Sequence, residues 1–100
     1  MDSKSVRHMV IFCLKHAVGS AEAEKFIQDG RAILSRIPVV KNFEALKQIS
    51  PRNDYSYGFS MEFDDQAAYD TYSNHPLHLE FVEQRWEKEV TRFLEIDFKL

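Results

Sequence analysis

Cysteine, glycine and proline are scarce in this sequence. Cys13 is the single cysteine among 100 residues, so no disulfide can form within one chain. Three glycines and three prolines leave no segment with the composition of a flexible linker. We therefore expect one domain over residues 1–100 and, since its thiol has no partner, a cytoplasmic protein. We interpret Cys13, which lies in an apolar strand pattern, as a small hydrophobic residue rather than a nucleophile.

The features by which proteins contact membranes and nucleic acids are also absent. No apolar run approaches the ~20 residues that span a bilayer. The polar start, Met1–Lys4, lacks the apolar core of a signal peptide. Lys and Arg (13) are interspersed with Asp and Glu (16), which leaves no basic stripe for a phosphate backbone. We expect neither a membrane nor a nucleic acid as a partner.

Two histidines have a spacing that is found in some metal sites. His75 and His78 are three positions apart, but no third ligand follows at a convincing spacing. We therefore expect no metal site, and nothing in the sequence indicates a cofactor.

Two hydrophobic periodicities alternate along the chain and predict an α+β fold. Residues 6–15 are apolar on both faces of a strand, which is typical of a central strand, and residues 55–63 show the clearest strand alternation. Ser20 is a suitable N-cap for a first helix that Pro38 ends. The other predicted elements are a strand at 42–49, a short helix capped by Asp64 or Asp65 and ending near Asn74, a helix from Pro76 to about Glu89, and a strand at 91–100 that buries Leu94, Ile96 and Phe98.

This order of elements gives a ferredoxin-like antiparallel four-stranded sheet with helices on one face. Gly30 interrupts the buried stripe of the first helix at a cost of ~1 kcal/mol relative to Ala, which indicates close approach of a ring from the sheet or of a ligand. The other face of the sheet carries Met9, Ile11 and Cys13, and no segment remains to cover it. A second copy would cover it by two-fold symmetry. We therefore expect a homodimer with these three residues at its interface.

Several segments resemble the stress-responsive dimeric α/β-barrel (Dabb) family. They are His8–Lys15, Ile37–Val40, Asp54–Ser56, Glu62–Asp64, Tyr72–His78 and Asp97. The stretch with Tyr72, the pair His75-Pro76 and then His78 is the most diagnostic of them. The resemblance implies a dimeric α/β barrel in which two such sheets face one another.

Within that family the sequence is distantly similar to the plant olivetolic acid cyclase, a cofactor-free polyketide cyclase. This similarity implies that His78 is the base, that Tyr72 assists it, and that His8 lies in the pocket. Tyr57 stands where the cyclase has a His, Phe59 is bulkier than its counterpart, and Gly30 replaces an aromatic residue. The pocket that we predict combines these positions with two neighbours; its residues are His8, Gly30, Tyr57, Phe59, His75 and Trp86, beside the tentative catalytic pair His78 and Tyr72.

Three functions remain open from the sequence, and whether the protein is an enzyme is one of the open points. The first is a homodimeric, stress-associated protein that binds a small organic ligand without changing it. The second is a cofactor-free lyase or cyclase that uses His78 as base and the Tyr72 hydroxyl as donor to an enolate oxygen. The third is a quinol or haem monooxygenase, which rests on fold analogy alone.

Overall fold

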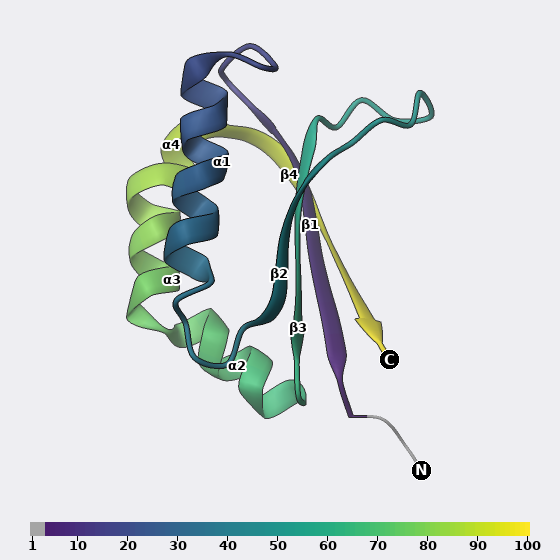
Figure 1. The fold of residues 1–100 in the computed structure, drawn as a ribbon, viewed down its shortest axis with the longest axis vertical. Helices are drawn as coiled ribbons and strands as arrows, with labels where there is room; N and C mark the ends of the chain where they lie inside the picture. The colour runs from purple at the N-terminus through teal and green to yellow at the C-terminus, as the bar shows by residue number, and fades with distance from the viewer. Residues whose placement is uncertain (1–3) are drawn as a thin grey trace.

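The computed structural model describes residues 4–100 (Figure 1). Of the polar start of the chain, only Lys4 falls within this range. The elements are β1 (Val6–Leu14), α1 (Ala21–Leu34), β2 (Lys41–Lys47), β3 (Tyr57–Phe63), α2 (Gln66–Asn74), α3 (Pro76–Phe81), the π-helix η1 (Val82–Trp86), α4 (Glu87–Glu89) and β4 (Val90–Lys99). The strands form one antiparallel sheet in the order β2-β3-β1-β4. Figure 1 shows every helix on the same side of this sheet, so the predicted ferredoxin-like fold is confirmed.

β1 is a central strand, paired with β3 on one side and β4 on the other. Its side chains alternate between the two faces of the sheet. Val10 and Phe12 are buried beneath the helices, whereas Met9 and Ile11 point to the opposite, outer face and are only partly covered. Both faces of β1 are therefore apolar, as its sequence predicts.

α1 begins where the sequence predicts, because the Ser20 hydroxyl accepts a hydrogen bond from the backbone N–H of Ala23 at 3.2 Å. Its buried stripe packs onto the sheet through Phe26 and Leu34. A Cβ added at Gly30 would lie 2.8 Å from the Phe59 ring and 3.1 Å from the Phe81 ring. The glycine therefore admits a ring from the sheet at this point, one of the two occupants that its position predicts.

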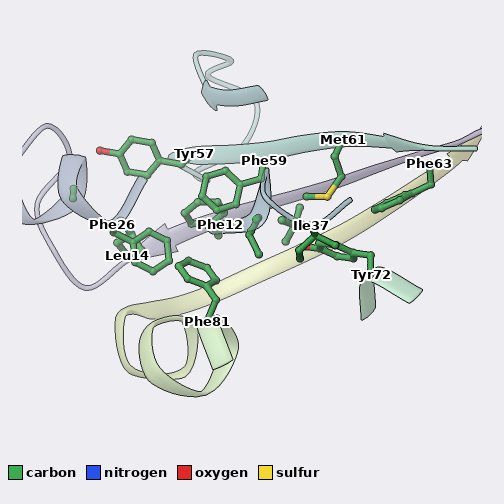
Figure 2. Packing of buried hydrophobic residues seen from close by; sticks show 13 residues of the cluster. Phe12, Leu14, Phe26, Ile37, Tyr57, Phe59, Met61, Phe63, Tyr72 and Phe81 are labelled. Atoms are coloured by element: carbon green, nitrogen blue, oxygen red, sulfur yellow. The ribbon is translucent and has the colours of Figure 1, made fainter. Parts of the chain in front are cut away.

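The core between sheet and helices is dominated by aromatic rings (Figure 2). Phe12 lies at its centre, with ring centroids 5.0 Å from Phe59, 5.8 Å from Phe26 and 4.9 Å from Trp86. Tyr57 and Tyr72 lie at opposite ends of this cluster in Figure 2. Tilted and edge-to-face contacts of this kind stabilise beyond the area that they bury.

The segment after Pro76 departs from prediction. Its pattern predicts one helix to about Glu89, but the helix is interrupted by the π-turn η1 before α4. The spacing of the apolar residues explains the π-turn. Phe81 and Trp86 are five residues apart, and a π-turn brings residues at this spacing onto the same side of the helix.

The prediction that β4 buries its apolar side chains is wrong for a single chain. Leu94 is 47% and Phe98 49% exposed, because these residues point to the outer face of the sheet, where no helix lies. The inward positions of β4 hold Phe93, Glu95 and Asp97 instead, opposite buried positions of β1. The outer face is thus more extensive and more apolar than β1 alone indicates.

Candidate functional site

A cavity of about 340 Å³ lies between the sheet and the helical segment from α3 to α4. Its apolar walls include Phe59, Phe81, Trp86 and Phe93. Its polar lining consists of His8, Tyr72 and His78, together with Glu87 and Glu95. The cavity thus combines aromatic walls with a few convergent polar groups, as small-molecule sites do.

Tyr72 and His78 meet at this cavity although six positions separate them. α2 ends at Asn74 and α3 starts at Pro76, and the turn between them brings the two rings to a centroid distance of 4.5 Å. The Tyr72 side chain is nearly fully buried, yet its hydroxyl makes no hydrogen bond within residues 4–100. The hydroxyl oxygen itself is not sealed off, since no fully buried side-chain N or O atom among the described residues lacks a partner, so it is available to a molecule in the cavity.

The hydrogen bonding of His78 defines its tautomer. Its Nδ1 lies 3.0 Å from the carbonyl oxygen of Ser73, and because a carbonyl only accepts, Nδ1 carries the hydrogen. Nε2 is left as an acceptor. Burial lowers the pKa of His78 below its ordinary value, although the Ser73 carbonyl opposes this. His78 is therefore a neutral imidazole with a free lone pair at neutral pH.

His8 is held in the same tautomer by a carboxylate. Its Nδ1 lies 2.6 Å from Oδ1 of Asp97, its partner in the β1–β4 register. The Tyr69 hydroxyl donates to the same carboxylate at 3.0 Å and lies 2.8 Å from His8 Nδ1. Because the carboxylate only accepts, Nδ1 of His8 carries a hydrogen, and Nε2 is the acceptor whenever the ring is neutral. A carboxylate-oriented histidine is a recurrent arrangement in proton-transfer sites.

Both tyrosines remain protonated at neutral pH. Burial raises the pKa of Tyr72, and the negative charge of Glu95 adds to the effect. Burial and the hydrogen bond to Asp97 raise the pKa of Tyr69. The Tyr72 hydroxyl is therefore a hydrogen-bond donor to anything that enters the cavity.

An ion-pair network fixes the helical wall of the cavity to α1. Arg85, in η1, donates to Asp29 of α1 and to Glu89 of α4, both at 2.6 Å. Glu89 also contacts Nε2 of His16 at 2.8 Å. Because Arg85 and Trp86 share the π-turn, this network holds the Trp86 ring in its place on the cavity wall.

The structure separates the predicted pocket residues into two groups. His8, Phe59 and Trp86 line the cavity with the pair Tyr72 and His78. Gly30, Tyr57 and His75 do not. Gly30 is covered by Phe59 and Phe81. The Tyr57 hydroxyl accepts from the Gly19 N–H at 3.0 Å near the start of α1, and His75 Nδ1 accepts from the Leu77 N–H at 3.1 Å as the N-cap of α3.

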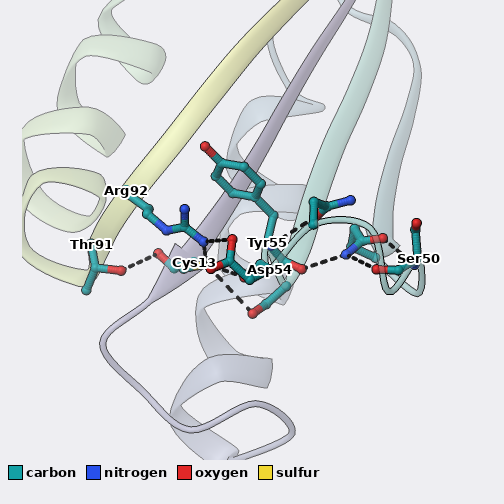
Figure 3. A network of polar contacts seen from close by, with 9 residues as sticks. Cys13, Ser50, Asp54, Tyr55, Thr91 and Arg92 are labelled. Carbon is teal, nitrogen blue, oxygen red and sulfur yellow. Dashed lines mark hydrogen bonds and ion pairs between the residues drawn. The ribbon is translucent and has the colours of Figure 1, made fainter.

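The predicted interface residues lie on the outer face of the sheet, away from the cavity. Met9 and Ile11 stand at its centre. Cys13 lies near the C-terminal end of β1. Its thiol donates to the carbonyl oxygen of Asp54 at 3.3 Å, and Arg92 forms an ion pair with the Asp54 carboxylate (Figure 3). Within the described chain, Cys13 takes part in a structural network, not in a nucleophile–base pair.

Sequence reasoning missed three polar residues of the site: Tyr69, Glu87 and Glu95. Glu95 and the Asp97 that orients His8 occupy alternate positions of β4, so strand alternation places both on one face, and their pairing with buried Val10 and His8 makes this the helix side of the sheet. Tyr69 lies one helical turn before Tyr72 on α2. The available signal was this shared face, read together with the pairing of β1 and β4.

Membrane-spanning helices and metal-ligand clusters were also sought among residues 4–100. No helix in this range is long and apolar enough to cross a membrane. No group of three or more His, Cys, Asp or Glu side chains in the same range is arranged to hold a metal ion.

Comparisons with known proteins agree with the fold. The profile of a family described as "Stress responsive A/B Barrel Domain" matches residues 6–100. A solved dabb family protein from Mesorhizobium loti is 55% identical, with a TM-score of 0.92 and 94% of each chain covered.

Two more distant solved structures share the fold alone. A dimeric protein of unknown function from Bacteroides fragilis is 19% identical, with a TM-score of 0.75 and both chains fully covered (100%). The hydroxynitrile lyase of Passiflora edulis is 17% identical, with a TM-score of 0.84, covering 98% of this chain and 94% of the lyase.

Proposed function

Because the chain belongs to the Stress responsive A/B Barrel Domain family, we propose that it acts as a homodimer that binds a small carbonyl compound and moves a proton on it without a cofactor. The observation that carries this proposal is the convergence of Tyr72 and His78, with ring centroids 4.5 Å apart, on a cavity lined by aromatic rings. A neutral base and a protonated donor at one site are what enolisation requires.

The chemistry follows from the two tautomers and the free hydroxyl. Nε2 of His78 takes a proton from the carbon next to the ligand's carbonyl, so that a C–H bond breaks and an N–H bond forms. The electron pair moves onto the carbonyl oxygen, and the Tyr72 hydroxyl donates a hydrogen bond to the developing enolate. Return of the proton from Nε2 to carbon completes an exchange. If the enolate carbon instead attacks the carbonyl of a second molecule, the proton passes from Nε2 to the new alkoxide, which restores neutral His78. Nε2 of His8, held by Asp97, offers a second proton acceptor.

Phe59 limits the size of the ligand. Its ring fills the space over Gly30, so the cavity touches α1 at Leu34 and extends from His78 toward Trp86 and β4. This favours a small carbonyl compound over a long polyketide.

The homodimer rests on the outer face of the sheet. The β1–β4 register places four apolar side chains side by side on this face: Met9, Ile11, Leu94 and Ile96. Figure 1 shows no helix on that side of the sheet. An apolar sheet face of this kind is covered in a stable protein, and a second copy offers a matching face. The Bacteroides fragilis protein of the same fold is described as dimeric.

The chemistry is tested by proton exchange rather than by a guessed turnover. A β-keto ester in D₂O is followed by NMR, and we expect the protein to accelerate loss of its α-hydrogen signal. His78→Ala should abolish the acceleration, and Tyr72→Phe should lower it about 100-fold. His75→Asn is the matched control, because Asn can replace the helix cap outside the cavity. If His78→Ala exchanged the α-hydrogen as fast as the parent protein, His78 would not be the base.

The pH profile of the same exchange gives a second readout. The base must be neutral, and burial lowers the pKa of His78. Activity is therefore expected to persist below about pH 6.5, the ordinary pKa of a histidine, and to fall only at more acidic pH. A loss of exchange centred above that pH would point to a different base.

A further inference from the structure

The charges at the cavity are of one sign. Glu87 of α4 and Glu95 of β4 belong to its lining, and the Asp97 carboxylate lies behind His8. No Lys or Arg side chain belongs to the described lining. Arg85, the cation in the adjacent π-turn, is engaged by Asp29 and Glu89. An anion that entered would meet like charges and no compensating cation.

The hydrogen-bonding groups of the cavity point to the same class of ligand. Nε2 of His8 and Nε2 of His78 are acceptors, and the Tyr72 hydroxyl is a donor. A carboxylate or phosphate on the ligand needs several donors and would find one. A carbonyl oxygen needs one donor, and an acidic C–H or O–H beside it suits the two acceptors.

Resting on the proposed function, we infer that the cavity selects an uncharged aromatic carbonyl compound and rejects its carboxylate and phosphate analogues. Glu87 and Glu95 are the selecting residues, and Trp86, Phe59 and Phe93 provide the surface on which a ring packs. At about 340 Å³ the cavity is near the lower end of the range for small-molecule sites, which suits one ring with a short substituent.

Binding can be measured without any reaction, because Trp86 is the only tryptophan and lines the cavity. The probes are methyl 4-acetylbenzoate and 4-acetylbenzoate, which differ in one charge and share a ring and a methyl ketone. Titration of each into the full-length protein at pH 7.5 should change Trp86 fluorescence. We expect the ester to bind at least about tenfold more tightly than the acid.

A double variant that removes both negative charges tests the role of Glu87 and Glu95 in selection. In Glu87→Gln with Glu95→Gln, the acid should bind about threefold or more tightly than in the parent protein, while the affinity for the ester stays the same. Both side chains are exposed, so this change should leave the fold intact. Equal affinities for ester and acid, no gain for the acid in the variant, or no fluorescence response to either probe would each overturn the inference. Selective ester binding without proton exchange would uphold it while refuting the proposed chemistry.

Discussion

Gly30 shows how one residue sets the shape of the cavity. Because it has no side chain, the Phe59 and Phe81 rings close over α1, and the free space is displaced toward Trp86. A buried glycine in a helix indicates close approach, but the sequence does not reveal whether a ring or a ligand approaches.

Replacing Gly30 is therefore a test of packing. Gly30→Ala gains about 1 kcal/mol in helix propensity but puts a Cβ 2.8 Å from the Phe59 ring. We expect the overpacking cost, about 1–3 kcal/mol, to outweigh that gain and give a net loss of up to about 2 kcal/mol in the free energy of unfolding, measured by urea denaturation.

The control for that substitution relieves the clash. In a Phe59→Leu background the same Gly30→Ala change should cost less, because the obstructing ring is gone. A Gly30→Ala protein as stable as the parent would show that the rings move aside freely, and the cavity would then be adaptable rather than fixed.

At the scale of elements, the π-turn η1 is what the hydrophobic pattern failed to predict. The pattern predicted helical residues from Pro76 onward. It also predicted the end of α2 near Asn74, and Asp65 is the cap of α2 among the two candidates, Asp64 and Asp65. An inserted residue in a helix changes which side chains share a face, yet leaves composition and propensity unchanged. The register of Arg85 and Trp86 therefore emerges only with the tertiary contacts to α1 and Phe12.

The network through Arg85 should stabilise this irregular segment. Arg85→Ala leaves Asp29 and Glu89 without their shared cation, and Glu89 has only 14% of its side chain exposed. We expect a loss of about 1–2 kcal/mol in the free energy of unfolding, together with a shift in Trp86 emission as its wall loosens.

An exposed ion pair on the same protein is the control for Arg85. Lys41 and Asp64 pair at 2.5 Å with side chains 55% and 68% exposed. Lys41→Ala should change stability by no more than about 0.5 kcal/mol. Equal effects for the two variants would contradict a special role for the Arg85 network.

At the scale of the molecule, the sequence predicted the fold class well because the order of helices and strands follows from apolar periodicity. It assigned the wrong face of β4 to the helices, because Leu94, Ile96 and Phe98 are more apolar than the positions that alternate with them. It also found Tyr72 and His78 only through family resemblance. Their contact depends on the angle between α2 and α3, which no periodicity encodes.

The proposed homodimer gives a testable prediction at this scale. Ile11→Lys places a charge at the centre of the outer face, opposite Leu94, where a partner would bury it. We expect a monomer or an unfolded chain by light scattering and circular dichroism.

Val18→Lys is the control for the dimer. It adds the same charge in the loop before α1, at a position already 64% exposed, and should leave the oligomeric state unchanged. A folded dimer of Ile11→Lys would show that the subunits meet through another surface.

The pairing of β1 with β4 has a consequence for how the protein is made. These strands come from opposite ends of the described chain, and their ladder joins His8 to Asp97 and flanks it with Glu95. While a ribosome is still translating residues 90–99, the nascent polypeptide has its first strand and all its helices but lacks this edge of the sheet. His8 then has no carboxylate to fix its tautomer. His8 is thus oriented only after β4 has been made and has paired with β1, so a product truncated before residue 90 would lack Glu95 and Asp97 at this site.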